Sequence, residues 1–243
     1  MKKITLTVLL TVLLTSVSHA QWWGSNKTIK GNGNSIEDTR STKDYDGVHV
    51  AGAMDVTLVA GNEGKITVKT DDNLQEYIVT EVENNTLKIY VKKGYNVSTR
   101  KGIIVTVPVE TIDEVALAGS GDVATSGITL KSNKITVRIA GSGDLDLAVD
   151  AKEVEGKLAG SGDLKLKGTT TTFDCSLAGS GDVYAADLKA TDVSVSVAGS
   201  GDARVYCDGN LNAKVVGSGD IYYKGNPKHE NSKVAGSGDI SKL

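Results

Sequence analysis

The chain has 243 residues, of which 23% are charged and 5% are aromatic, and its formal net charge at neutral pH is -3. A mildly acidic chain lacks the cationic surface that attracts nucleic acid or anionic membranes, so we expect neither as its main partner. Only two prolines occur, and no segment has a pattern that suggests a helical domain.

Residues 1–20 have the pattern of a secretory signal peptide. Two lysines precede an apolar run from Ile4 to Leu14, and small residues flank a cleavage site before Gln21. Removal of this segment takes away two lysines and changes the formal net charge from -3 to -5. We therefore expect an exported protein, located in the periplasm, on the outer-membrane surface or secreted from the cell.

The tetrapeptide Gly-Ser-Gly-Asp occurs seven times in the second half of the chain, at intervals of 18 to 22 residues. A repeat of about 20 residues predicts a solenoid, in which each copy forms one coil and stacks on its neighbours. The motifs begin at Gly119, Gly141, Gly160, Gly179, Gly199, Gly217 and Gly236.

Apolar residues alternate with polar ones on both sides of each motif. Two positions before the first glycine stand Leu117, Ile139, Leu158, Leu177, Val197, Val215 and Val234. Four positions after it stand Val123, Leu145, Leu164, Val183, Ala203, Ile221 and Ile240. A period of two is typical of half-buried strands, and the glycines between them suit a bend. The sequence predicts an all-β fold, a parallel β-helix-like solenoid with coils of about 20 residues.

The part that precedes the repeats carries the same signals less regularly. The segment Ala51–Asp55 is a degenerate copy of the motif, alternating apolar runs follow it, and Asn84 and Asn85 supply a turn. We expect this part to continue the same sheet. The predicted division is a signal peptide at 1–20, a flexible lead-in at 21–44 and a β-solenoid at 45–243, with an irregular part at 45–110 and the repeats at 111–243.

These repeats, together with the segments Tyr45–Val50 and Asn85–Ile89, resemble the autotransporter adhesin head domain, also called the head GIN domain. The resemblance covers roughly residues 45 to 243. It implies an exported bacterial protein with an all-β, solenoid-like fold and an adhesin-like role. We therefore expect a non-enzymatic binding module whose partner is a glycan or a protein at the cell envelope.

The aspartates of the motifs form a column that should face outward, one residue per coil. One interpretation is structural, with each carboxylate accepting hydrogen bonds from the motif serine and from backbone N–H groups at the glycine corner. The other is a row of Ca²⁺ sites, although calcium needs six to eight oxygen ligands and no second acidic column accompanies the first. The candidate metal ligands are Asp122, Asp144, Asp163, Asp182, Asp202, Asp220 and Asp239.

Two positions beyond these aspartates, four consecutive coils carry Lys165, Tyr184, Arg204 and Tyr222. These residues should alternate cation and aromatic ring along one outer face. Such a strip could bind a glycan or a protein edge, so these four residues are the candidates for ligand binding. The alternative is a surface ladder in which the four side chains only support one another.

Signatures of catalysis are few. After the signal segment the chain has only His49 and His229, no metal-ligand spacing and no Gly-x-Ser-x-Gly nucleophile elbow. We predict no enzymatic activity and no cofactor. The alternative is a β-helix carbohydrate-active enzyme, a glycosidase or lyase, which would need a carboxylate pair in a cleft built by long loops.

Cysteine positions and the last coil give two further expectations. Cys175 falls in an apolar column and Cys207 in a different place within its coil, so we expect no disulfide between them. No capping helix is evident after the last motif, so the final coil should expose a strand edge. Pairing through that edge predicts a homodimer.

Overall fold

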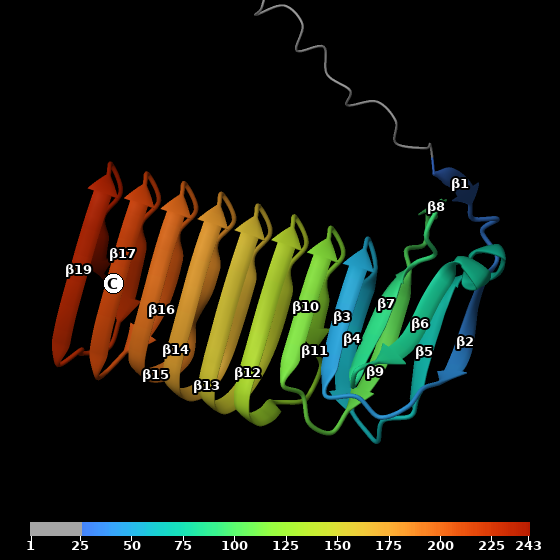
Figure 1. The fold of residues 1–243 in the computed structure, drawn as a ribbon, viewed down its shortest axis with the longest axis horizontal. Helices are drawn as coiled ribbons and strands as arrows, with labels where there is room; N and C mark the ends of the chain where they lie inside the picture. Colours follow the sequence, from blue (N-terminus) through green and yellow to red (C-terminus); the bar gives the residue numbers. More distant parts are fainter. Residues whose placement is uncertain (1–25) are drawn as a thin grey trace, which may run out of the picture.

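The computed structural model describes residues 26–243. The expected signal peptide, residues 1–20, lies outside the described residues. Strands stack side by side into one elongated body, with tight turns along one edge (Figure 1). Within this part of the chain, no helix combines the length and the apolar character that a membrane span requires. The parallel solenoid predicted from the repeats is confirmed.

Each coil runs from one Gly-Ser-Gly-Asp motif to the next. In the middle of the stack a coil is one long bent strand: β13 (Leu145–Gly160), β14 (Leu164–Gly179) or β15 (Val183–Gly199). In the other coils, the chain between two motifs forms two shorter strands instead of one long strand. These are β10 (Glu114–Gly119), β11 (Val123–Thr125), β12 (Leu130–Gly141), β16 (Ala203–Cys207), β17 (Asn210–Gly217), β18 (Ile221–Lys224), β19 (His229–Gly236) and β20 (Ile240–Lys242).

Neighbouring coils pair in parallel with the motifs in register. Gly119 lies opposite Gly141, and Gly141 lies opposite Gly160. Gly119 also pairs with Gly52 of β3 (Gly47–Gly52), and β11 pairs with β4 (Asp55–Ala60). The degenerate motif at Ala51–Asp55 therefore forms one more coil of the same stack, as its sequence predicts.

The other end of the stack changes from parallel to antiparallel pairing. β7 (Thr86–Val91) and β9 (Ile104–Val109) continue the parallel sheets beside β3 and β4. β6 (Ile78–Glu83) and β5 (Lys65–Asp71) then pair antiparallel with β7 and β9, and a 3-10 helix, Asp72–Tyr77, joins β5 to β6. Strands β3 to β7 and β9 thus lie in the same sheet as the strands of the repeats.

The sequence predicts a flexible lead-in at 21–44, but from Lys27 onward this segment contains two paired strands. β1 (Lys27–Lys30) pairs in parallel with β8 (Tyr95–Ser98), and β2 (Ser35–Ser41) pairs antiparallel with β5. Both strands are polar because they lie at the outer end of the stack, where most of their side chains are exposed or only half-buried. Backbone pairing, which leaves no hydrophobic pattern in the sequence, holds them in place.

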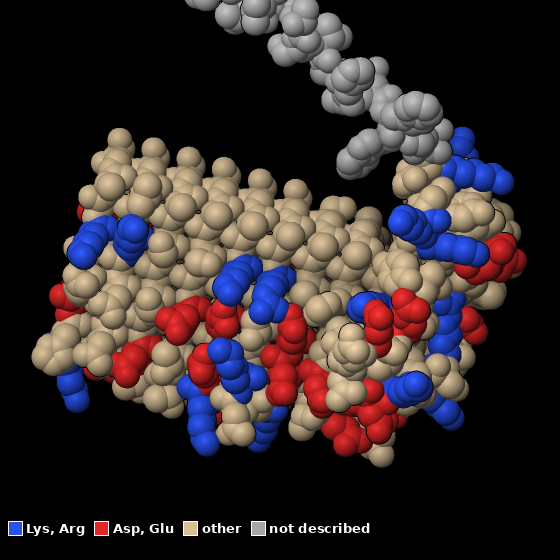
Figure 2. All heavy atoms as spheres, in the orientation of Figure 1, with Lys and Arg blue, Asp and Glu red and all other residues tan. Residues whose placement is uncertain are grey.

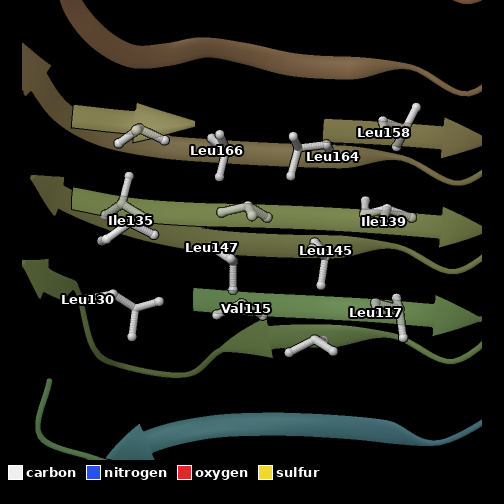
Figure 3. Packing of buried hydrophobic residues seen from close by; sticks show 14 of the residues in the cluster. Val115, Leu117, Leu130, Ile135, Ile139, Leu145, Leu147, Leu158, Leu164 and Leu166 are labelled. Carbon is white, nitrogen blue, oxygen red and sulfur yellow. The ribbon is translucent and has the colours of Figure 1, made fainter. Parts of the chain in front are cut away.

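Stacked aliphatic side chains fill the interior between the two faces of each coil. Leu117, Ile139 and Leu158 lie in one such column, and Leu145 and Leu164 lie in the facing one (Figure 3). All of these side chains are buried. At about 25 cal/mol per Å² of apolar surface removed from water, this continuous core is the main source of stability.

Two different constraints require glycine at the corner of each coil. The first glycine of the motifs has φ between +133° and +139°, a conformation that L side chains rarely adopt. The second glycine lies against the coil before it: a Cβ at Gly162 would be 2.0 Å from the carbonyl oxygen of Gly143. The corner therefore has no space for a side chain at either position.

Among the described residues, β19 and β20 form the last edge of the stack, and each pairs with a neighbouring coil on one side only. Polar residues occupy the core columns there: Glu230 follows Leu211, Ser232 follows Ala213 and Lys242 follows Tyr223. Charged side chains at inward positions are one way in which a sheet edge is kept from pairing further. Val234, 47% exposed, adds apolar surface to this edge.

The homodimer through this edge stays a prediction. Because the inward positions are largely polar, we expect backbone pairing rather than apolar burial to hold the dimer, which should dissociate on dilution. Val234→Lys adds a charge at an inward position of this edge and should abolish the dimer. It should not lower the unfolding midpoint, since the Val234 side chain is already exposed. Sedimentation velocity at increasing protein concentration measures the oligomeric state of the parent and of the Val234→Lys variant. A parent chain that is monomeric at every concentration contradicts the prediction.

Candidate functional site

Two outward columns run beside each other just after the glycine corner. In the first, which we call the Asp column, every carboxylate except that of the last aspartate, Asp239, accepts a hydrogen bond from the backbone N–H of the aspartate in the next coil. The Oδ1 of Asp144 accepts from Asp163 at 2.8 Å, and the Oδ1 of Asp163 accepts from Asp182 at 3.1 Å. The same bond repeats along the column at distances between 2.7 and 3.4 Å.

This arrangement corrects part of the structural interpretation of the aspartates. The donor is the backbone of the neighbouring coil, and no hydrogen bond from a motif serine hydroxyl to these carboxylates occurs within residues 26–243. The column also begins one coil earlier than the motifs predict, because Asp55 accepts from Asp122. Its second oxygens bond tyrosines at two places: Tyr184 donates to Asp182 and Tyr222 donates to Asp220.

The alternative interpretation of the Asp column, a row of calcium ions, stays a prediction. Within the described part of the chain, no three His, Cys, Asp or Glu side chains gather closely enough to hold a metal ion. One oxygen of most of these carboxylates already accepts a backbone N–H. A calcium ion on this column would therefore depend on the remaining oxygens and on water.

A pair of substitutions at Asp163 separates the hydrogen bond from the charge. Asp163→Asn keeps Oδ1 as an acceptor for the Asp182 N–H and removes one charge from a column of like charges, so we expect little change or a small stabilisation. Asp163→Ala leaves that N–H without its acceptor and should cost about 1 kcal/mol more than the Asn variant. Urea unfolding of both variants measures the difference, and equal stabilities would contradict a bonding role.

The second column, which we call the mixed column, contains the four predicted binding residues, and the structure stacks them in coil order. The Lys165 ammonium nitrogen lies 5.8 Å from the centre of the Tyr184 ring. The Arg204 guanidinium carbon lies 5.3 Å from the Tyr184 ring centre and 5.5 Å from that of Tyr222. The predicted alternation of cation and aromatic ring is therefore present.

The stacking decides which parts of these rings a partner could touch. Lys165 and Arg204 belong to the coils on either side of Tyr184, so cations cover both faces of that ring. Tyr222 has Arg204 over one face. The mixed column therefore offers ring edges and charged groups for hydrogen bonding, and little ring face for stacking against a sugar.

A third feature lies on the opposite side of the corner, where a shallow depression of about 510 Å³ crosses the outer face of β7, β3, β10, β12 and β13. We call it the apolar strip. It is formed by Ala51, Tyr90, Ala118, Ala140 and Ala159. Figure 2 shows a band without charged side chains along this face of the molecule. Sequence reasoning missed the strip because it considered only inward apolar positions.

Charged side chains border the apolar strip on one side. Arg138 pairs with Glu114, and Lys157 pairs with Glu155 at 2.5 Å. Burial, followed by the charge of Arg138, lowers the pKa of His49, so this side chain is neutral at pH 7. The border thus combines cations with their acidic partners and has little net charge.

Both cysteines are free and buried, as expected from their different positions in the coil. Burial raises the pKa of the Cys175 thiol to about 12, so the thiol is protonated at neutral pH. Burial also raises the pKa of Cys207. Neither thiol has the exposed, electropositive surroundings of a reactive cysteine.

Fold and surface together define a parallel β-solenoid that presents regular side-chain columns on its outer faces. The chain belongs to the family described as "Putative auto-transporter adhesin, head GIN domain", whose model matches residues 44–227. The resemblance of the motifs to this family is thereby confirmed. A comparison with curated proteins found no match.

Solved structures share this fold. A "putative adhesin" from Bacteroides fragilis is 23% identical with a TM-score of 0.83, over 88% of this chain and 100% of that chain. A "Putative lipid binding protein" from Parabacteroides distasonis is 32% identical with a TM-score of 0.74, over 89% and 100%. A "putative adhesin" from the same species is 25% identical with a TM-score of 0.72, over 89% and 100%.

Proposed function

We propose that this protein is an exported, non-enzymatic binding module of the cell envelope, with an adhesin-like role. The observation that carries the proposal is the uninterrupted mixed column on the outer face, where four coils in succession present side chains that can bond to a partner. The adhesin names of its family and of similar structures support it. The signal-peptide pattern of residues 1–20 supports export.

The architecture also favours binding over catalysis. A β-helix glycosidase or lyase needs two carboxylates placed across a cleft, and long loops usually build that cleft. Here the coils return after about 20 residues, and the carboxylates of the Asp column repeat regularly along it. Turnover of a bound polysaccharide by the purified protein would contradict this part of the proposal.

The partner that fits the mixed column is polar, either a glycan or a protein edge. The Tyr184 ring is covered on both faces, so contact would come from Lys165, Arg204 and the exposed ring edges. These groups bond hydroxyls and carboxylates, which glycans and protein surfaces both carry.

A matched pair of double variants tests the mixed column. The first double variant, Lys165→Ser with Tyr222→Ser, changes the two ends of the mixed column. The control, Tyr206→Ser with Lys224→Ser, removes one tyrosine and one lysine from outward positions outside the mixed column. These two control residues lie opposite each other in neighbouring strands. We expect the first variant to lose at least about tenfold in affinity for an immobilised envelope extract, a loss of about 1.4 kcal/mol. Equal affinities of the two variants, measured by biolayer interferometry, would remove the mixed column from the proposal.

The apolar strip favours a second candidate function, binding of an amphipathic lipid. Four exposed alanines and the half-buried Tyr90 form an apolar surface, and Arg138 and Lys157, each paired with a glutamate, lie at its border. Contiguous exposed apolar surface on a soluble domain often marks an interaction site. One structure of similar fold, 32% identical, carries the name of a lipid binding protein.

Co-sedimentation with vesicles of anionic and zwitterionic phospholipid tests this candidate. Ala118→Asp combined with Ala140→Asp should abolish binding, because the change places charge in the middle of the strip. Ser161→Asp combined with Ser180→Asp, at two exposed serines of the corner itself, is the control. No binding of the parent chain to either vesicle would eliminate the lipid function.

A further inference from the structure

A groove of about 460 Å³ crosses the outer face of β14, β15, β17 and β19, in the last coils of the stack (Figure 1). It lies on the same side of the glycine corner as the apolar strip, but in different coils. Two outward columns line it, and neither belongs to the surfaces described above. One column is Thr172, Asp192, Asn210 and His229, and the other is Asp174, Ser194, Asn212 and Asn231.

The second of these columns has hydrogen-bonding groups to spare. Asn231 Nδ2 donates to Asn212 Oδ1 at 3.2 Å, which leaves the Asn212 amide N–H groups and the Asn231 amide oxygen for a partner. Within residues 26–243, no hydrogen bond joins the side chain of Asp174 or Ser194 to another residue. All four side chains are exposed. The groove therefore offers both donors and acceptors.

The half-buried Asp192 organises the first column. Its Oδ1 accepts hydrogen bonds from the Asn210 backbone N–H at 2.9 Å and from Asn210 Nδ2 at 2.6 Å. A Cβ at Gly209 would lie 2.7 Å from the same oxygen, so glycine allows this close approach. These bonds tie β15 to the start of β17 and orient the Asn210 side chain. A wall that is ordered before binding lowers the entropic cost of holding a ligand.

Earlier coils carry ion pairs at the equivalent positions. Five residues before their motifs stand Glu114 and Glu155, each paired with a basic side chain. The last three coils have Ser194, Asn212 and Asn231 at the same position. This face therefore changes along the stack from charges that satisfy one another to uncharged polar groups that can bond a partner.

Charge and backbone pairing narrow the choice of partner. Among the described residues, the lining of the groove includes the carboxylates Asp174, Asp192 and Glu230 but neither lysine nor arginine. These negative charges would repel an acidic polysaccharide. β14, β15 and β17 have neighbouring strands on both sides, so a strand of a protein partner has no edge to join within the groove. A neutral partner that binds through hydroxyl groups meets neither obstacle.

We propose that this groove binds a linear, neutral glycan that lies along the stack, across β14, β15, β17 and β19. Neighbouring coils are about 4.8 Å apart, a distance comparable with the length of one sugar unit, so successive sugars meet successive polar side chains. Amides donate to and accept from sugar hydroxyls, and carboxylates accept from them. The inference rests on the proposed function of a binding module and adds a second surface to it.

Affinity electrophoresis of the mature chain in gels that contain the neutral or the acidic fraction of bacterial envelope polysaccharide tests the groove. Asp174→Ala combined with Asn212→Ala should weaken binding to the neutral fraction at least about tenfold, since each lost hydrogen bond weakens binding about two- to tenfold. Any binding of the acidic fraction, which the cations of the mixed column could hold, should stay the same. Both side chains are exposed, so the urea midpoint should not change.

Asp146→Ala combined with Asn133→Ala is the matched control, because it removes one carboxylate and one amide from exposed positions outside the groove. It should bind the neutral fraction as the parent does. The inference alone is overturned if the parent binds envelope fragments but not the neutral fraction, or if the groove variant binds that fraction as tightly as the control. Equal weakening toward both fractions would also overturn it. A parent that binds neither polysaccharide nor envelope fragments would contradict the proposed function as well.

Discussion

Gly162→Ala should destabilise the protein by at least about 3 kcal/mol, because the new methyl group would overlap the backbone of the neighbouring coil. A Cβ at Gly162 would lie 2.0 Å from the Gly143 carbonyl oxygen. The three nearest atoms all belong to the backbone of that coil, which cannot rotate away as the end of a side chain could. Relief requires that two coils separate, which breaks the hydrogen-bonded ladder between them.

Gly127→Ala is the matched control for this substitution. Gly127 has φ of +68°, and nothing lies within 4 Å of the position that its Cβ would occupy. Only the cost of the left-handed conformation remains, about 1 to 2 kcal/mol. Urea unfolding of the two variants measures the contrast. A Gly162→Ala variant as stable as Gly127→Ala would mean that the coils are not packed as closely as the structure shows.

Phe173→Ala should cost about 3 to 5 kcal/mol, the range found when a buried aromatic side chain is removed from a core. Phe173 is 1% exposed and is the only phenylalanine in the chain. Gly156, in the coil beside it, lies next to the ring: a Cβ there would be 3.6 Å from a ring carbon, an ordinary packing contact. The tighter neighbour of that position is a Leu164 methyl carbon, at 3.1 Å.

A double-mutant cycle tests this tight contact. Gly156→Ala alone should be destabilising, because its methyl group would lie 3.1 Å from a Leu164 methyl carbon. Combined with Leu164→Ala, which removes that methyl carbon, it should cost less than the sum of the two single changes. Additive effects in urea unfolding would show that the two positions do not share the same space.

The repeats made most of the fold predictable. Alternation around each motif indicated strands, and the constant spacing aligned Gly119 with Gly141 and all later motifs in one column. The same spacing predicted that Lys165, Tyr184 and Arg204 would stack, because residues at equal positions in a solenoid lie above one another. Periodicity fixes both the inward columns and their outward neighbours.

The unrepeated parts could not be predicted in this way. β1 and β2 are polar strands held by backbone pairing, which leaves no apolar pattern in the sequence. The buried Asp71 lies where three segments that are distant in the chain meet, at residues 31, 71 and 99. The covered faces of the Tyr184 ring depend on side-chain stacking, which spacing alone does not reveal.

The measurement that tests the proposed function most directly is a binding isotherm of the mature chain on bacterial envelope fragments. Fragments treated with protease, with periodate, which oxidises glycans, or left untreated are compared by sedimentation of labelled protein. The account predicts saturable binding to untreated fragments that one of the two treatments abolishes, which identifies the partner as protein or glycan. Binding that never saturates, or is no greater than that of an unrelated soluble protein of similar charge, would contradict the assignment of this solenoid as a binding module.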